Sequence, residues 1–179
     1  MTITALLMAI AIVIPIVMPV RIVIGPASFT LASHVPIFIA MFFSPSIAVI
    51  VALGATLGFF IAGFPIIIVL RALSQVVFAL VGAKIIENRN LMDTITDSVV
   101  KSQLFSFVIA LIHAIGETAI VTVFFFGGLG LDTTRGFFYT VFLLVGVGTL
   151  VHSMVDFIIT QYIWKAQKDR LMDLKTRIA

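Results

Sequence analysis

Three pairs of polar residues interrupt a sequence that is otherwise almost entirely apolar. The members of each pair are four positions apart, and the pairs are Arg71 with Gln75, His113 with Glu117, and His152 with Asp156. In a helix, residues four positions apart lie on one face. Side chains of these types can recognise a small ligand, form interhelical ion pairs, ligate a metal or transfer a proton.

Arg71 and Glu117 support two interpretations that the sequence leaves open. They can form an interhelical ion pair that fixes helix packing. Alternatively, the planar guanidinium of Arg71 suits a ligand carboxylate or ring-substituent oxygen, and Glu117 can accept a hydrogen bond from an amino, hydroxyl or protonated ring nitrogen. Both hold if the pair is closed when empty and is opened by ligand. We predict that Arg71, Gln75, His113 and Glu117 form a binding site for a small polar heterocycle.

His152 and Asp156 are expected to lie below this pocket, in the inner half of the last helix. There they would satisfy each other or His113. Their spacing does not match an open coordination site and the helix depths differ, so no metal site is predicted. The chain has no cysteine, which excludes thiolate ligands and disulfides.

Three more residues near the outer face are candidates for ligand contact. His34 follows the first long loop, where it can contact a ligand or cap the loop. Phe29 and Tyr139 can stack on a planar ring. These three complete the predicted substrate-binding set.

The elements that must position these side chains are membrane helices. Of the 179 residues, 61% are hydrophobic and only 11% are charged, against about 25% charged in a soluble domain. The apolar runs are continuous and do not alternate with polar residues, which favours helices over a β-barrel. Breaks at Pro, Gly and charged residues separate six predicted helices, at Thr2–Met18, Thr30–Phe43, Ser46–Ala62, Pro65–Glu87, Thr96–Phe126 and Phe137–Lys168. We therefore predict an all-α membrane protein, a six-transmembrane-helix bundle forming one domain over residues 1–179.

The distribution of basic residues predicts that both termini are cytoplasmic. With the N-terminus inside, the outer loops hold only Arg21 and Arg135. The cytoplasmic segments, including the inner ends of the predicted helices, hold Lys84, Arg89, Lys101, Lys165, Lys168, Arg170, Lys175 and Arg177. Such an excess on one side is typical of cytoplasmic loops. The tail after Gln167 is expected to extend the last helix, with Trp164 as an interfacial anchor.

The outer segment Pro19–Ser33 is too long for a tight turn and too apolar for a solvated loop. An apolar loop of this kind is expected to pack onto the bundle. It can be a static plug or a lid over a ligand pocket.

Several of these features together resemble the S components of energy-coupling factor (ECF) vitamin transporters. They are six helices in a short chain, the small-residue face Ala5-x-x-x-Ala9, the long apolar first outer loop, and the run from Pro26-Ala27-Ser28-Phe29-Thr30 to Phe43-Ser44-Pro45. Small residues four apart, as also at Gly54 and Gly58, let helices approach closely.

The resemblance implies a substrate-binding subunit of the prokaryotic plasma membrane. It would capture a vitamin under the first loop and dock on a membrane T component driven by two ATPase subunits, with Ala5 and Ala9 making the docking contact. The chain has no Gly-x-x-x-x-Gly-Lys-Ser/Thr loop, so ATP would be used by partner subunits and no cofactor is expected here. No nucleic-acid partner is expected.

The favoured ligands are pyridoxine and hydroxymethylpyrimidine, because Arg71 with Glu117 suits a heterocycle bearing donors and acceptors. Niacin and pantothenate are the alternatives, since Arg71 can bind their carboxylate. Two other functions remain open. One is an intramembrane enzyme using His113 and Glu117 as acid and base, although no nucleophile or metal set accompanies them. The other is a self-sufficient transporter, for which neither an internal repeat nor a ring of like residues is present.

Overall fold

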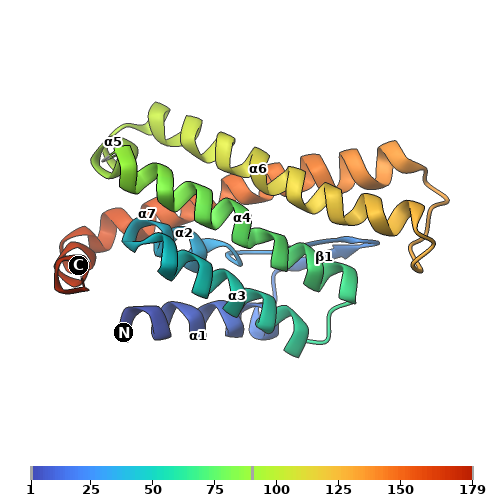
Figure 1. Cartoon of the computed structure of the whole chain (residues 1–179), viewed down its shortest axis with the longest axis horizontal. Coiled ribbons are helices and arrows are strands. Elements are labelled where there is room, and N and C mark those ends of the chain that lie inside the picture. Colours follow the sequence, from blue (N-terminus) through green and yellow to red (C-terminus); the bar gives the residue numbers. More distant parts are fainter. Residues whose placement is uncertain (1, 90, 179) are drawn as a thin grey trace.

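The computed structural model describes residues 2–89 and 91–178, which form an elongated bundle of helices (Figure 1). The helices are α1 (Thr2–Val17), α2 (Val35–Phe43), α3 (Pro45–Ile61), α4 (Ile66–Arg89), α5 (Met92–Asp97), α6 (Val99–Phe126), the π-helix η1 (Phe138–Val147) and α7 (Gly148–Ile178). Within the described ranges, three segments are long and apolar enough to cross a membrane: Ile66–Asn88, Val99–Phe126 and Phe138–Thr176. The predicted helical membrane fold is confirmed at this level.

The second predicted helix is shorter than expected. It was predicted over Thr30–Phe43, but α2 begins at Val35 and has nine residues, all of them buried. Thr30 lies in a strand, and the positive φ of 63° at Ala32 is incompatible with a continuous helix. Nine residues rise about 14 Å, roughly half of the hydrocarbon core, so α2 does not span a membrane alone.

The outer segment contains a β-hairpin that the sequence analysis did not predict. Strands β1 (Arg21–Ile24) and β2 (Ala27–Thr30) pair antiparallel around the two-residue turn Gly25–Pro26. Gly25 has a φ of 54°, which such a turn requires. Strand β1 is exposed along its length, whereas Ala27 and Thr30 of β2 are buried. The segment therefore packs onto the bundle through β2, as expected for an apolar loop.

The last helix is longer than predicted and is irregular where it begins. It starts as the π-helix η1 and continues as α7 to Ile178, so the predicted tail extension is present. Trp164, however, is only 1% exposed and packs on Phe42, with ring centroids 4.7 Å apart. Lys175 donates a hydrogen bond to the carbonyl oxygen of Phe42 at 2.7 Å. The C-terminal half of α7 thus covers the end of α2, and Trp164 is a core residue and not an interfacial anchor.

Helix α1 packs on α3 through one face and leaves another face free. A Cβ atom on Gly58 would lie 2.5 Å from the carbonyl oxygen of Ile12, so only glycine allows this approach. Ile3, Leu7 and Ala11 are buried in the core of the bundle. Ala5 and Ala9 lie on the exposed face of α1. The small-residue face of α1 is therefore not used for packing within the described chain.

Helix α1 begins and α7 ends at the same end of the bundle, near α5 (Figure 1). The hairpin and the loop between α6 and η1 lie toward the other end. The arrangement agrees with a chain that crosses the bundle an even number of times.

Candidate binding site

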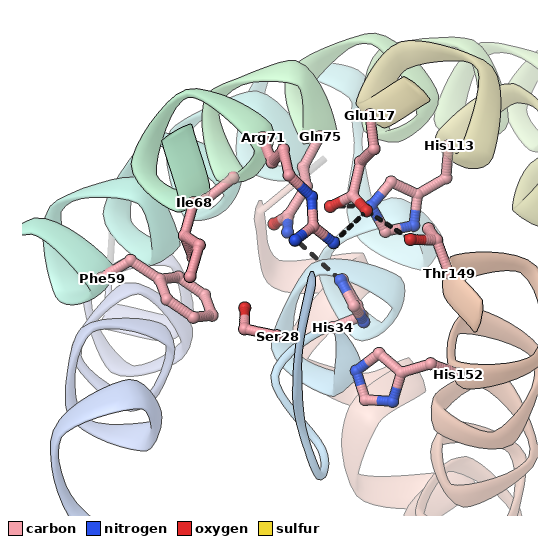
Figure 2. Close-up of a pocket in the computed structure, with 11 residues that line it drawn as sticks. Ser28, His34, Phe59, Ile68, Arg71, Gln75, His113, Glu117, Thr149 and His152 are labelled. Carbon is pink, nitrogen blue, oxygen red and sulfur yellow. Dashed lines mark hydrogen bonds and ion pairs between the residues drawn. The ribbon is translucent and has the colours of Figure 1, made fainter. Parts of the chain in front are cut away.

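A small cavity beside the hairpin gathers polar side chains from α2, α4, α6 and α7 (Figure 2). Its volume of about 10 Å³ is close to the least space that holds one water molecule. The residues that line it are Ser28, His34, Phe59, Ile68, Arg71, Ala72, Gln75, His113, Glu117, Thr149 and His152. Five of the seven predicted substrate-binding residues thus lie around one cavity.

An interhelical ion pair between Arg71 and Glu117, one of the two open interpretations, is formed across α4 and α6. Arg71 Nη2 donates to Glu117 Oε2 at 2.6 Å, and both side chains are buried. The Thr149 hydroxyl donates to the same carboxylate oxygen. Arg71 Nη1 donates to the carbonyl oxygen of Pro26, in the hairpin turn. Arg71 therefore connects the ion pair to the hairpin.

Several polar atoms around the cavity have no hydrogen-bond partner among the described residues. They are Arg71 Nε, Gln75 Oε1 and both ring nitrogens of His113. His113 Nε2 lies 3.2 Å from Glu117 Oε1, but the orientation does not make a hydrogen bond. Buried polar groups in proteins are usually paired, so these atoms are available to a ligand.

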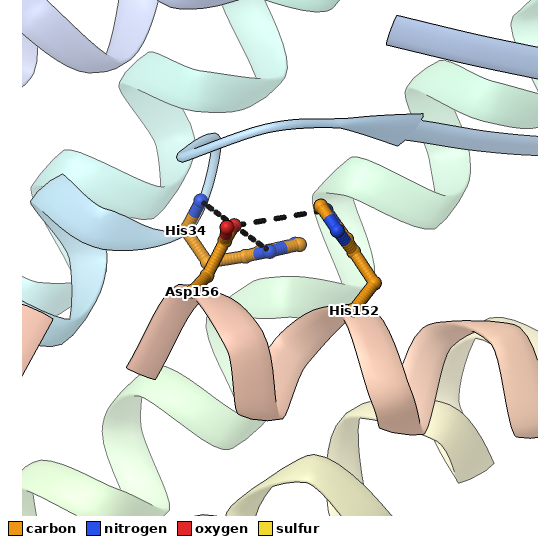
Figure 3. Close-up of side chains that lie close together, drawn as sticks. All are labelled: His34, His152 and Asp156. Atoms are coloured by element: carbon orange, nitrogen blue, oxygen red, sulfur yellow. Dashed lines mark hydrogen bonds and ion pairs between the residues drawn. The ribbon is translucent and has the colours of Figure 1, made fainter. Parts of the chain in front are cut away.

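Asp156 holds the chain at the start of α2 (Figure 3). Its Oδ1 accepts the backbone N–H of Ala32 at 2.9 Å, and its Oδ2 accepts the backbone N–H of His34 at 3.0 Å. Nδ1 of the His34 ring lies 2.9 Å from Oδ2. Because an ionised carboxylate only accepts, Nδ1 carries a proton. In the neutral ring, Nε2 then accepts from the Gln75 amide nitrogen at 3.2 Å.

The prediction that His152 lies below the pocket is wrong, whereas Asp156 is not among the lining residues. His152 lines the cavity, with its ring centroid 5.0 Å from that of His34, and Asp156 binds His34 directly. The reason is the late start of α2, which carries His34 into the bundle to the level of these α7 residues. His152 Nε2 and Asp156 Oδ2 are 3.6 Å apart, too far for a hydrogen bond.

Ligand-type atoms of His34, His152 and Asp156 lie within 4.8 Å of one another. This grouping was not expected, since the residues were assigned to different depths. The oxygens of Asp156 already accept three hydrogen bonds, which account for the position of its carboxylate. That the chain binds no metal stays a prediction.

Phe29 and Tyr139 are outside the cavity lining. The Phe29 ring contacts His152 edge-on, with centroids 5.7 Å apart, so it lies behind a lining residue. Tyr139 is 39% exposed, and its hydroxyl accepts a hydrogen bond from Arg135 at 3.2 Å. The structure therefore does not bring Tyr139 to the predicted site.

Sequence reasoning missed Thr149 and His152 as lining residues, although a signal for both exists. Polar residues recur every three or four positions along α7, at Thr149, His152, Asp156 and Thr160, and Ser153 is four positions after Thr149. This period predicts one polar face toward the bundle interior. Ile68 and Ala72 share the face of α4 that carries Arg71 and Gln75, so helical spacing also points to them. Ser28 and Phe59 reach the cavity through tertiary packing, for which the local sequence carries no signal.

The niacin transporter NiaX of Lactococcus lactis subsp. cremoris (strain MG1363) is 44% identical to this chain over 155 residues. The match covers 87% of this chain and 68% of the relative. No protein-family model matches the chain. No solved structure matches it. Together with the apolar helices, the match identifies a multi-pass protein of the cell membrane that acts in transport. The chain belongs to the S components of ECF vitamin transporters, the family that its small-residue face and apolar outer loop resemble.

Proposed function

We propose that this S component captures niacin at the outer face of the membrane. Two observations support the proposal: the relative is a niacin transporter, and Arg71 is buried at the cavity with an unpartnered Nε. From the residues alone, pyridoxine or hydroxymethylpyrimidine is favoured, with niacin or pantothenate as the alternative. The niacin alternative has better support, because the relative is a niacin transporter. The Arg71 guanidinium also suits the carboxylate of nicotinate.

In the proposed complex, the carboxylate lies on Arg71 and the pyridine ring lies against the apolar wall formed by Phe59 and Ile68. Gln75, with its free carbonyl oxygen, and His34 are within the same cavity and would contact the ring edge. His113 and Glu117 lie on the side of Arg71 that faces away from Phe59 and Ile68 (Figure 2). Phe29 would act indirectly through His152, and Tyr139 is left out of the proposed site.

Capture requires the cavity to open, because an aromatic carboxylate is far larger than about 10 Å³. Arg71 bonds both Glu117 and the carbonyl of Pro26, so the residue proposed to bind the ligand also bonds the hairpin turn. The turn would move aside for entry and bond Arg71 again over the bound ligand. This supports the lid interpretation of the Pro19–Ser33 segment over the static plug.

Delivery would use a T component and two ATPase subunits. The exposed face of α1 with Ala5 and Ala9 is proposed as the contact with the T component, because small side chains permit close helix approach. We further propose that residues 1–179 act as one domain with both termini in the cytoplasm. The placement of α5 and the charge-rich half of α7 at one end of the bundle supports this orientation.

Isothermal titration calorimetry of the purified protein with nicotinate, pyridoxine, hydroxymethylpyrimidine and pantothenate tests the ligand. Nicotinate should bind most tightly, and native mass spectrometry should find it bound after purification. Tight binding of pyridoxine without binding of nicotinate would contradict the proposal. Uptake into cells should require the T component and ATPases, which a self-sufficient transporter would not. Recovery of a chemically altered ligand would point to an enzyme.

A further inference from the structure

We propose that capture of nicotinate is coupled to uptake of one proton, and that His113 holds this proton. The inference rests on the proposed function, because it concerns how the Arg71 site accepts an anion.

The charges around the cavity do not allow an anion to enter without compensation. With neutral histidines, the buried charged groups among the described residues are the Arg71 cation and the Glu117 and Asp156 carboxylates. One cation therefore already faces two anions, and a ligand carboxylate would be a third. Burying an unpaired charge is costly, so a new positive charge must accompany the ligand.

Arg71 is able to exchange Glu117 for the ligand. Glu117 occupies Nη2 alone, and the neighbouring Nε has no partner among the described residues. A ligand carboxylate can bind Nε and Nη2 together, which is the strong bidentate form of this contact. Glu117, once displaced, keeps the Thr149 hydroxyl and needs a new cation.

His113 is the histidine placed to become that cation. The residue is 1% exposed, and neither ring nitrogen makes a hydrogen bond in the described part of the chain. Nε2 is already 3.2 Å from Glu117 Oε1. A proton on Nε2 would convert this contact into a charged hydrogen bond. The proton comes from solvent, and no other bond is made or broken.

The other two histidines are less suited. The His34 ring uses Nδ1 on Asp156 and Nε2 on Gln75. The Nε2 atom of His152 lies 3.4 Å from Ser33 Oγ and 3.6 Å from Asp156, away from Glu117.

The surroundings of His113 favour Glu117 as its counter-ion. His34, just before α2, and Phe78 of α4 pack on its ring, with centroids 4.7 Å and 4.5 Å away. The charged and titratable groups that face it are His34 at the start of α2, Arg71 of α4, Glu117 of α6, and His152 and Asp156 of α7. Of the two carboxylates, only Glu117 contacts it.

Proton uptake can be measured by titrating nicotinate into the protein in buffers that differ in ionisation enthalpy, between about pH 6 and pH 8. The dependence of the observed enthalpy on the buffer counts the protons taken up. We expect about one proton per nicotinate and about none for nicotinamide, which has the same ring and no charge. Nicotinate binding without proton uptake in the wild-type protein would overturn the inference and leave the proposed function standing. Failure of nicotinate to bind would overturn the proposed function itself.

The variants His113→Gln and His152→Gln assign the proton. His113→Gln should abolish proton uptake and weaken nicotinate binding about tenfold or more, because the displaced Glu117 then lacks its cation. His152→Gln should keep the proton uptake. The reverse pattern would overturn the assignment to His113. Because the proton count on wild-type protein needs no variant, poor folding of either variant leaves the coupling itself testable.

Discussion

Asp156 on α7 accepts both the backbone N–H and the ring Nδ1–H of His34, which lies 122 residues earlier at the start of α2. The pair fixes the end of the hairpin segment to the last helix. It also sets the orientation of the His34 ring, whose Nε2 faces Gln75 in the cavity. The hairpin is thus held at one end by Asp156 and at its turn by Arg71.

Asp156→Ala is expected to destabilise the protein by about 3–5 kcal/mol, because three buried donors lose their acceptor. Thermal unfolding in detergent measures the loss, and hydrogen exchange at Ala32 and His34 locates it. Asp97→Ala is the control, since Asp97 is 65% exposed in its pair with Lys168 and should change unfolding little. Unchanged exchange at Ala32 would contradict the role of Asp156 as an anchor.

Arg71→Ala should weaken nicotinate binding by about 2–5 kcal/mol, because Glu117 and the ligand both lose their cation. Glu117→Gln keeps the shape and removes the competing anion, so nicotinate should bind it at least as tightly as wild-type protein. Calorimetry gives the affinities and thermal unfolding gives the stabilities. Wild-type affinity in both variants with reduced stability would instead identify a purely structural ion pair.

Ala5→Trp or Ala9→Trp should block assembly with the T component and leave nicotinate binding unchanged. Both residues are on the exposed face of α1, where a bulky side chain prevents close helix approach. Co-purification and calorimetry report the two properties separately. Val77→Trp, at an exposed position of α4, serves as the control for added bulk. Normal co-purification of the Ala5 and Ala9 variants would exclude this face.

The hairpin should change its mobility when ligand binds. Spin labels at Val23 and Ile24, which are 50% and 43% exposed, report motion of β1. Saturating nicotinate should order them, since closure of a lid buries apolar loop side chains over the pocket. Identical spectra with and without nicotinate would favour the static plug.

A substitution at Gly148 should displace the hairpin through Phe29. A Cβ atom on Gly148 would lie 2.5 Å from the Phe29 ring, so Gly148→Ala should lower the unfolding temperature and Phe29→Leu should partly restore it. A double-mutant cycle measures this coupling. Additive effects of the two substitutions would show that the contact is not tight.

Much of the helical framework was predictable because the apolar runs are long and end at Pro, Gly or charged residues. The polar residues of α4 and α6 that line the cavity were also predictable. Each helix carries two of them four residues apart in an apolar context, and these are Arg71 with Gln75 and His113 with Glu117. That Arg71 and Glu117 meet across α4 and α6 was one of the two interpretations left open by the sequence.

The hairpin and the place of His34 were not predictable in the same way. The residues from Val20 to Thr30 are apolar enough to suit a strand, a loop or a helix end, and their packing on α7 decides among these. The depth of His152 relative to the pocket was then misjudged, because it depends on where α2 begins. Tyr139 was misjudged because the winding of η1 is not apparent from the residues.

The half-length of α2 has a consequence for how the protein is made. A nine-residue helix preceded by a hairpin is too short to be recognised as a span during membrane insertion. The non-helical backbone of the hairpin before α2 is tolerated in the bilayer only where protein buries it. Asp156, which binds the start of α2, is synthesised 122 residues after His34. We expect residues 19–43 to remain unsettled at the membrane surface during synthesis and to enter the bundle last, after α7 has been inserted.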